Sequence, residues 1–69
     1  MKIMMNTAED AWMMDDEEFL ATAKPATMEE VAKLNDLADE RSREWHFYVP
    51  TFRVIGDVMM FYLDGPFEG

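Results

Sequence analysis

The chain has 69 residues, a net charge of −9 and no cysteine, which limits it to one small domain without disulfides or thiolate metal sites. This charge opposes direct binding to nucleic acid or to an anionic membrane, because phosphate groups repel carboxylates. A basic protein partner is expected instead. Apolar residues make up 49% of the chain and aromatic residues 13%, a composition that favours a folded domain over disorder.

The N-terminal third is predicted to begin with a strand and continue as helix. Residues 2–5 (KIMM) are short and apolar, and they favour a strand over a frayed end. Residues 7–23 are predicted to be helical, with Asn6 or Thr7 as the N-cap. Two short helices are the alternative, because Asp15 is also a suitable N-cap for a second helix.

Residues 28–44 carry the clearest helical pattern in the sequence. Thr27 is a candidate N-cap, and Glu30 occupies the reciprocal position of a capping box. The apolar residues that follow fall on a stripe about a third of the helix circumference wide, which is typical of a core-facing helix. These residues are Met28, Val31, Leu34, Ala38 and Trp45.

In residues 46–64 the pattern of apolar side chains repeats every second residue, which indicates the two strands of a β-hairpin. Gly56-Asp57 fits a two-residue type II′ turn with glycine in its first central position, and this register places Phe52 opposite Phe61. Residues 65–69 are expected to form a loose tail. The predicted core face of the hairpin comprises Tyr48, Pro50, Phe52, Val54, Met59, Phe61 and Leu63.

The second face of the hairpin is more apolar than a solvated sheet face should be. Its residues are Val49, Thr51, Arg53, Ile55, Val58, Met60 and Tyr62. Either a helix covers this face or it meets another chain. The predicted fold is therefore a small single α+β domain in which one or two N-terminal helices and a long helix pack on a C-terminal β-hairpin, with residues 2–5 as a candidate third strand.

Signatures of catalysis and of metal binding are missing. Zinc sites need clusters of cysteine and histidine, and the only histidine is His46. The acidic run at 15–18 lacks the alternating ligands and central glycine of a calcium loop. Ser42 lies four residues before His46, with Asp39 one turn earlier, but a capping or packing role is favoured for Ser42 and His46. We expect no enzyme activity, no catalytic, metal-binding or cofactor-binding residues, and no cofactor.

Carboxylates dominate the predicted helices. Residues 9–18 contain six of them without a basic residue, and residues 28–44 contain six more. Their simplest role is solubility, and their functional interpretation is mimicry of a phosphate backbone, presented to a nucleic-acid-binding protein. The candidate partner-binding residues are Asp15, Asp16, Glu17, Glu18, Glu29, Asp36, Asp39, Glu40, Met13, Met60 and Tyr62.

Methionine and tryptophan occur among these charges, and both residue types are enriched at interfaces. Trp12 and Trp45 are nevertheless expected in the core, because large aromatic side chains dominate core packing. Met13 and Met14 cannot both face one core, so at least one of them should be exposed or at an interface.

Two functions remain open. The chain resembles in size and composition the small inhibitors that phages use against host nucleic-acid machinery, a type that includes anti-CRISPR, anti-restriction and RNA-polymerase-binding proteins. This resemblance implies a non-enzymatic inhibitor that binds a basic protein surface and neither nucleic acid nor membrane directly. The alternative is a structural or adaptor module that homodimerises through the second hairpin face. Either would be cytoplasmic, in the host cell if the source is viral.

Overall fold

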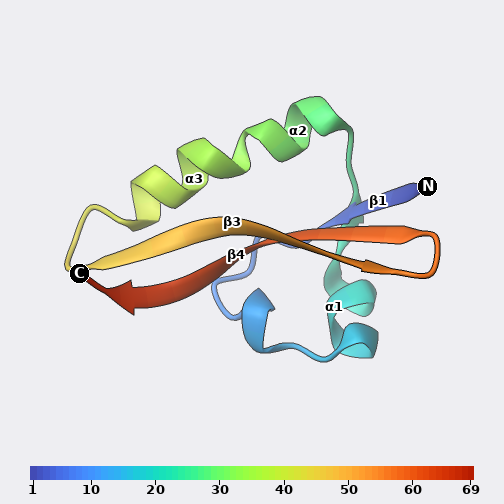
Figure 1. The fold of residues 1–69 in the computed structure, drawn as a ribbon, viewed down its shortest axis with the longest axis horizontal. Coiled ribbons are helices and arrows are strands. Elements are labelled where there is room, and N and C mark those ends of the chain that lie inside the picture. Colours follow the sequence, from blue (N-terminus) through green and yellow to red (C-terminus); the bar gives the residue numbers. More distant parts are fainter.

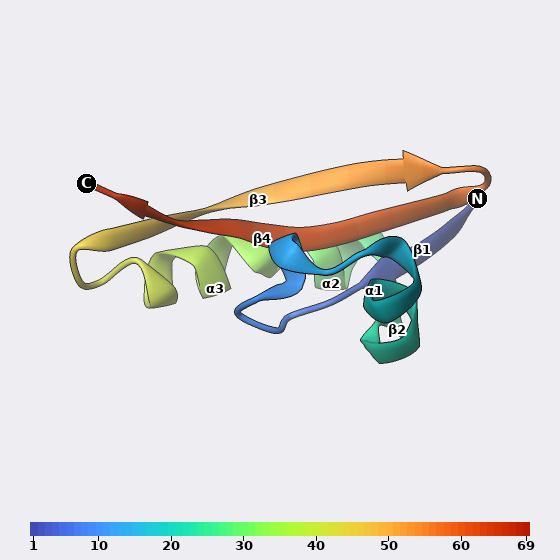
Figure 2. The same cartoon turned by 90° about the horizontal axis from the view of Figure 1, so that it is seen from below.

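The fold is a mixed four-stranded sheet with helices on both faces (Figures 1 and 2), and the computed structural model describes all of residues 1–69. The strand order is β2-β1-β4-β3, with β1 parallel to β4 and the other neighbours antiparallel. The strands are β1 (Lys2–Met5), β2 (Lys24–Pro25), β3 (His46–Ile55) and β4 (Val58–Glu68). The helices are the 3₁₀ helix η1 (Ala11–Met13), α1 (Asp16–Thr22), α2 (Met28–Ala32) and α3 (Leu34–Arg41). The α+β class, the helix packed on a C-terminal hairpin and the strand at residues 2–5 are confirmed.

The segment predicted as one helix over residues 7–23 is divided into η1 and α1. The alternative start is the correct one, since the Asp15 side chain accepts a hydrogen bond of 2.8 Å from the Glu18 backbone N–H. Asn6 is not an N-cap. Its backbone N–H still donates to the Phe61 carbonyl on β4 at 3.0 Å, so the chain is extended there and the first helical turn begins only at Ala11.

The predicted long helix is also divided, into α2 and α3 with Lys33 between them. The capping box at its start is confirmed, because the Thr27 hydroxyl accepts from the Glu30 N–H and the Glu30 carboxylate accepts from the Thr27 N–H. The helix ends at Arg41 rather than at residue 44. Trp45 therefore no longer follows the helical period, and it is 82% exposed instead of lying in the core.

The hairpin has the predicted register, with Phe52 opposite Phe61. Gly56 has φ +60° and Asp57 does not have positive φ, the combination that defines a type II′ turn. The predicted tail at 65–69 is wrong, because β4 continues to Glu68 and pairs with the start of β3. The pairing shifts register between Phe47 and Val49, and this irregularity lets β4 continue past its turn-like Gly-Pro sequence.

Gly65 lies at this irregularity, and its replacement by alanine should destabilise the domain by about 2–3 kcal/mol. Its φ of +150° strains any residue with a side chain, and a Cβ there would lie 2.8 Å from the Phe47 carbonyl oxygen. Gly56→Ala is the matched control, since φ is also positive but the added Cβ meets nothing within 4 Å. The midpoint of urea unfolding should therefore be lower for Gly65→Ala than for Gly56→Ala. Equal midpoints would contradict the close approach of the Gly65 backbone to the Phe47 carbonyl oxygen.

Two hydrophobic clusters cover the two faces of the sheet. Ala11 and Phe19 pack on Met60 and Tyr62 of β4 from one side, with the Phe19 and Tyr62 rings edge to face at 5.8 Å. On the other side Leu63 belongs to a cluster with α2 and α3, whose other members are Val31, Leu34 and Ala38. On the apolar second face of the hairpin the N-terminal helices cover Met60 and Tyr62 of β4, whereas Val49 and Ile55 of β3 remain 44% and 41% exposed. Met60 and Tyr62 are 0% and 7% exposed, so both are wrong as candidate partner-binding residues.

Candidate protein-binding site

The surface with the greatest excess of carboxylates is formed by residues 9–18, which we call the acidic segment. It comprises η1, the start of α1 and the loops beside them, on the sheet face opposite α2 and α3 (Figures 1 and 2). All its carboxylate residues are exposed, and the segment contains no base. They are Glu9, Asp10, Asp15, Asp16, Glu17 and Glu18.

Two large apolar side chains are exposed between these carboxylates. A 3₁₀ helix repeats every three residues, so Ala11 and Met14 both turn towards the cluster around Phe19. Trp12 and Met13 consequently point elsewhere and are 41% and 68% exposed. The expectation that one of the two adjacent methionines is exposed is confirmed. The expectation that Trp12 lies in the core is wrong, because η1 replaces the longer helix on which it rested.

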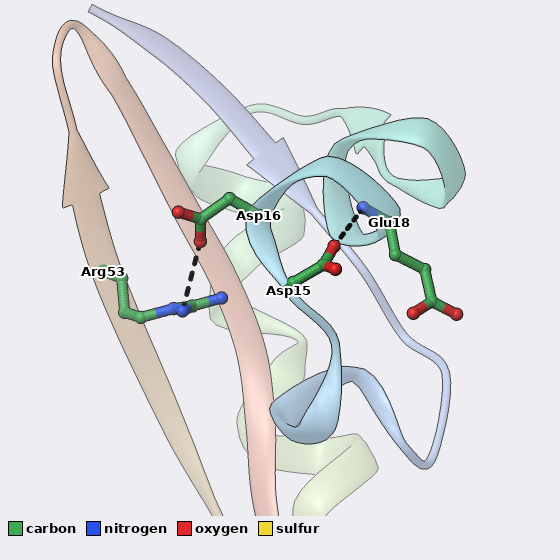
Figure 3. Close-up of polar contacts among 4 residues, drawn as sticks. All are labelled: Asp15, Asp16, Glu18 and Arg53. Carbon is green, nitrogen blue, oxygen red and sulfur yellow. Dashed lines mark hydrogen bonds and ion pairs between the residues drawn. The ribbon is translucent and has the colours of Figure 1, made fainter.

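At the start of α1 two carboxylates serve the fold itself (Figure 3). The Asp15 side chain caps the helix, and a carboxylate oxygen of Asp16 lies 3.3 Å from Nη1 of Arg53 on β3. The Arg53 guanidinium also lies 5.4 Å from the centroid of the Tyr62 ring and 5.9 Å from that of Phe19. Glu17 and Glu18 make neither a cap nor an ion pair with their side chains, and they remain available to a partner.

Arg53→Ala should cost about 1–2 kcal/mol, and Asp16→Ala no more than about 1 kcal/mol. The ion pair is half in solvent, with side-chain exposures of 38% and 52%, and exposed pairs contribute little. In addition, the aliphatic part of the Arg53 side chain packs on the two aromatic rings, and its guanidinium makes cation–π contacts with them. Thermal unfolding of both variants at low and high salt measures the difference. An Asp16→Ala loss as large as that of Arg53→Ala would contradict the packing contribution.

The second group of predicted carboxylates lies on α2 and α3, on the opposite face of the sheet (Figure 1). Its members Glu29, Asp36, Asp39 and Glu40 are all exposed. The basic residue Lys33 lies between them in the sequence and Arg43 follows them, and both are also exposed. The structure therefore does not bring the two acidic groups into one surface, and the acidic segment is the more negative of the two.

The remaining polar features contribute to the fold. The Ser42 hydroxyl accepts a 2.9 Å hydrogen bond from the Tyr48 N–H of β3, which ties the end of α3 to the sheet. A hollow of about 350 Å³ adjoins Asn6 and Thr22, but the Asn6 amide bonds internally to Thr22, to Phe19 and to Ala8. No group of three or more His, Cys, Asp or Glu side chains is arranged to hold a metal ion.

Comparison of the chain with protein-family models, with curated proteins and with solved structures gave no match. None of its helices has the length and apolar character needed to span a membrane. The candidate site therefore depends on the geometry and charge of this chain alone.

Sequence reasoning found the carboxylates of the acidic segment and one of its two apolar contacts, and it missed Trp12. An available signal was Asp15 itself. A cap at that position ends any earlier helix, so a helix before it is confined to the eight residues 7–14 and cannot be continuous with α1. It also missed the role of Arg53, although this is the only basic residue on a face that otherwise carries uncharged side chains.

Proposed function

We propose that this chain is a non-enzymatic, phage-type inhibitor whose acidic segment occupies the basic, nucleic-acid-binding surface of a host protein. The observation that supports this proposal is the exposure of Trp12 and Met13 among six carboxylates that have no basic residue in their segment. Targets of this kind include CRISPR effectors, restriction enzymes and RNA polymerase, and the site of action would be the cytoplasm of the host cell.

The two kinds of residue in the site would make different contributions to binding. Carboxylates steer a basic partner towards the surface and determine its orientation, and their effect weakens as salt screens it. Exposed tryptophan and methionine supply apolar area that leaves water on binding, and tryptophan is strongly enriched among residues that dominate binding energy. A surface that served solubility alone would not need either apolar side chain to be exposed.

The proposal is tested by capture from a bacterial lysate on the immobilised protein at low and high salt, with the retained proteins identified by mass spectrometry. We expect nucleic-acid-binding proteins at low salt, weaker retention at high salt, and release of the retained protein when duplex DNA is added in excess. Retention that neither salt nor DNA changes would contradict mimicry of nucleic acid.

Charge reversal separates the two acidic surfaces. The double variant Glu17→Lys/Glu18→Lys should weaken binding to the purified target at least tenfold, because two attractive contacts become repulsive. Asp36→Lys/Glu40→Lys carries the same change in net charge on the opposite face and should weaken binding much less. Calorimetric titration gives both affinities. Equal losses would indicate a general effect of net charge and contradict a site at the acidic segment.

A further inference from the structure

Strand β3 forms one edge of the sheet, and part of its backbone faces solvent. Figure 2 shows β3 along the upper side of the sheet, with no helix beyond it. The Phe61 carbonyl accepts from Asn6 next to β1, so the backbone of Phe61 faces away from β3. Residues of an antiparallel pair alternate between hydrogen-bonded and non-hydrogen-bonded positions. Phe52, opposite Phe61, therefore directs its N–H and C=O outward, as do Pro50 and Val54.

The middle of this edge has two free donors. The outward N–H of Tyr48 is bonded to the Ser42 hydroxyl at 2.9 Å, and Pro50 has no N–H. The outward N–H groups of Phe52 and Val54 have no strand to pair with, since the sheet ends at β3. Unpaired donors and acceptors of this kind form a template for another strand.

The side chains of the same stretch are apolar and exposed on both faces of the sheet. On one face Phe52 is 58% exposed and Val54 47%, and on the other face Ile55 is 41% exposed. The whole of β3 contains no carboxylate, and its only lysine or arginine is Arg53, which is paired with Asp16. The edge thus carries no negative charge of its own that would repel a second copy of this acidic protein.

We propose that two copies of the chain associate through β3, antiparallel and centred on Phe52, to form a continuous eight-stranded sheet. In this register the Phe52 N–H of each copy donates to the Phe52 carbonyl of the other. Each Val54 N–H donates to the Pro50 carbonyl opposite. Both free donors in the middle of the edge are used in this way, and the strand is the same in both copies, as a two-fold interface requires.

The charge of Arg53 selects this register over its neighbour. Centring the pair one residue later would place the two Arg53 residues directly opposite each other, which destabilises a sheet. Centred on Phe52, each Arg53 faces Thr51 of the second copy. A basic peptide is a less suitable occupant, because the carboxylates that would attract it lie on the helices and not along this edge. The pairing of the two β3 strands uses no carboxylate of the acidic segment, and the inference is independent of the proposed function.

Light scattering across a wide concentration range tests the dimer with purified protein alone. The mass should rise from 8.1 kDa towards twice that value, because a strand-edge contact lies below about 1,200 Å² and dissociates on dilution. Val54→Pro removes an outward donor without removing a bond to β4 and should remain monomeric. Phe67→Ser, with a 40% exposed side chain away from the edge, should still dimerise. A wild-type monomer at every concentration would overturn the proposal.

The register is tested by single cysteines, for which this cysteine-free chain provides a clean background. Phe52→Cys places two sulfurs across the two-fold axis, where the Cα atoms of a hydrogen-bonded pair are about 5.5 Å apart, within disulfide range. Val54→Cys is the control, because its two positions are offset by four residues along the strands, about 13 Å. Mild oxidation should cross-link Phe52→Cys at least tenfold faster. Equal rates for the two variants would overturn this pairing.

Discussion

Replacing Met60 with lysine should unfold the domain. Met60 is 0% exposed, between Ala11 and Phe19 on the covered face of β4. An ammonium group there would have no partner, and an unpaired buried charge costs several kcal/mol. A domain of this size is stable by only about 3–10 kcal/mol, taking roughly 0.05–0.15 kcal/mol per residue. The substitution therefore removes most of the free energy of unfolding.

Circular dichroism and urea titration measure this outcome, with Met13→Lys as the control. Met13 is 68% exposed, and a lysine there should change the stability by less than about 0.5 kcal/mol. If the hairpin face were instead a dimer surface, Met60→Lys would give a folded monomer with a midpoint like that of Met13→Lys. That result would contradict the helical cover over β4.

Asn6 should be the most sensitive polar position, with Asn6→Ala costing about 3 kcal/mol. The side chain is 3% exposed and joins the end of β1 to α1. Its Nδ2 donates to the Thr22 hydroxyl at 2.8 Å and to the Phe19 carbonyl at 3.3 Å, and its Oδ1 accepts from the Ala8 N–H at 3.0 Å. Removing the amide leaves buried groups unsatisfied, at about 1–3 kcal/mol each.

The variant Asn6→Asp keeps the shape of the side chain but removes the N–H donors of Nδ2, so it tests whether the hydrogen bonds donated by Asn6 stabilise the fold. A carboxylate keeps the bond from Ala8 but can donate nothing to Phe19, so its ionised form should destabilise the fold and its pKa should lie above that of the unfolded chain. Below the unfolded value of about 3.9 both states are protonated and the penalty is absent. The loss of stability should grow as the pH rises from this unfolded value to the pKa that the carboxyl group has in the folded state. Urea titrations against pH, relative to wild type, check this difference, and a difference independent of pH would contradict the Nδ2 bonds.

The parts of the fold that the sequence predicted well are those set by local chemistry. The turn at Gly56 needs a residue that accepts positive φ, and the alternation on either side then determines the register of Phe52 and Phe61. The capping box at Thr27 was likewise recognisable, because its bonds join residues three apart. Both features depend on neighbours in the sequence, and both are confirmed.

The incorrect predictions concern residues whose place depends on distant segments. The helical stripe extends past Arg41 in the sequence, but the chain must turn there to start β3, and Trp45 is left exposed. Residues 65–69 carry turn residues, yet the start of β3 offers them a partner strand. For the candidate site, the carboxylates were predictable from composition, whereas the burial of Met60 depended on where η1 and α1 would pack.

The parallel pairing of β1 with β4 has a consequence for how this domain acquires its structure. The first and last strands of the fold are neighbours at the centre of the sheet, and the partners of each pair, such as Lys2 and Val58, are 56 positions apart in the sequence. Contacts of such long range are slow to form, because the intervening chain must be ordered before they stabilise anything. During synthesis β1 therefore cannot pair with β4 until β4 has left the ribosome. The domain should fold in one late, cooperative step rather than segment by segment.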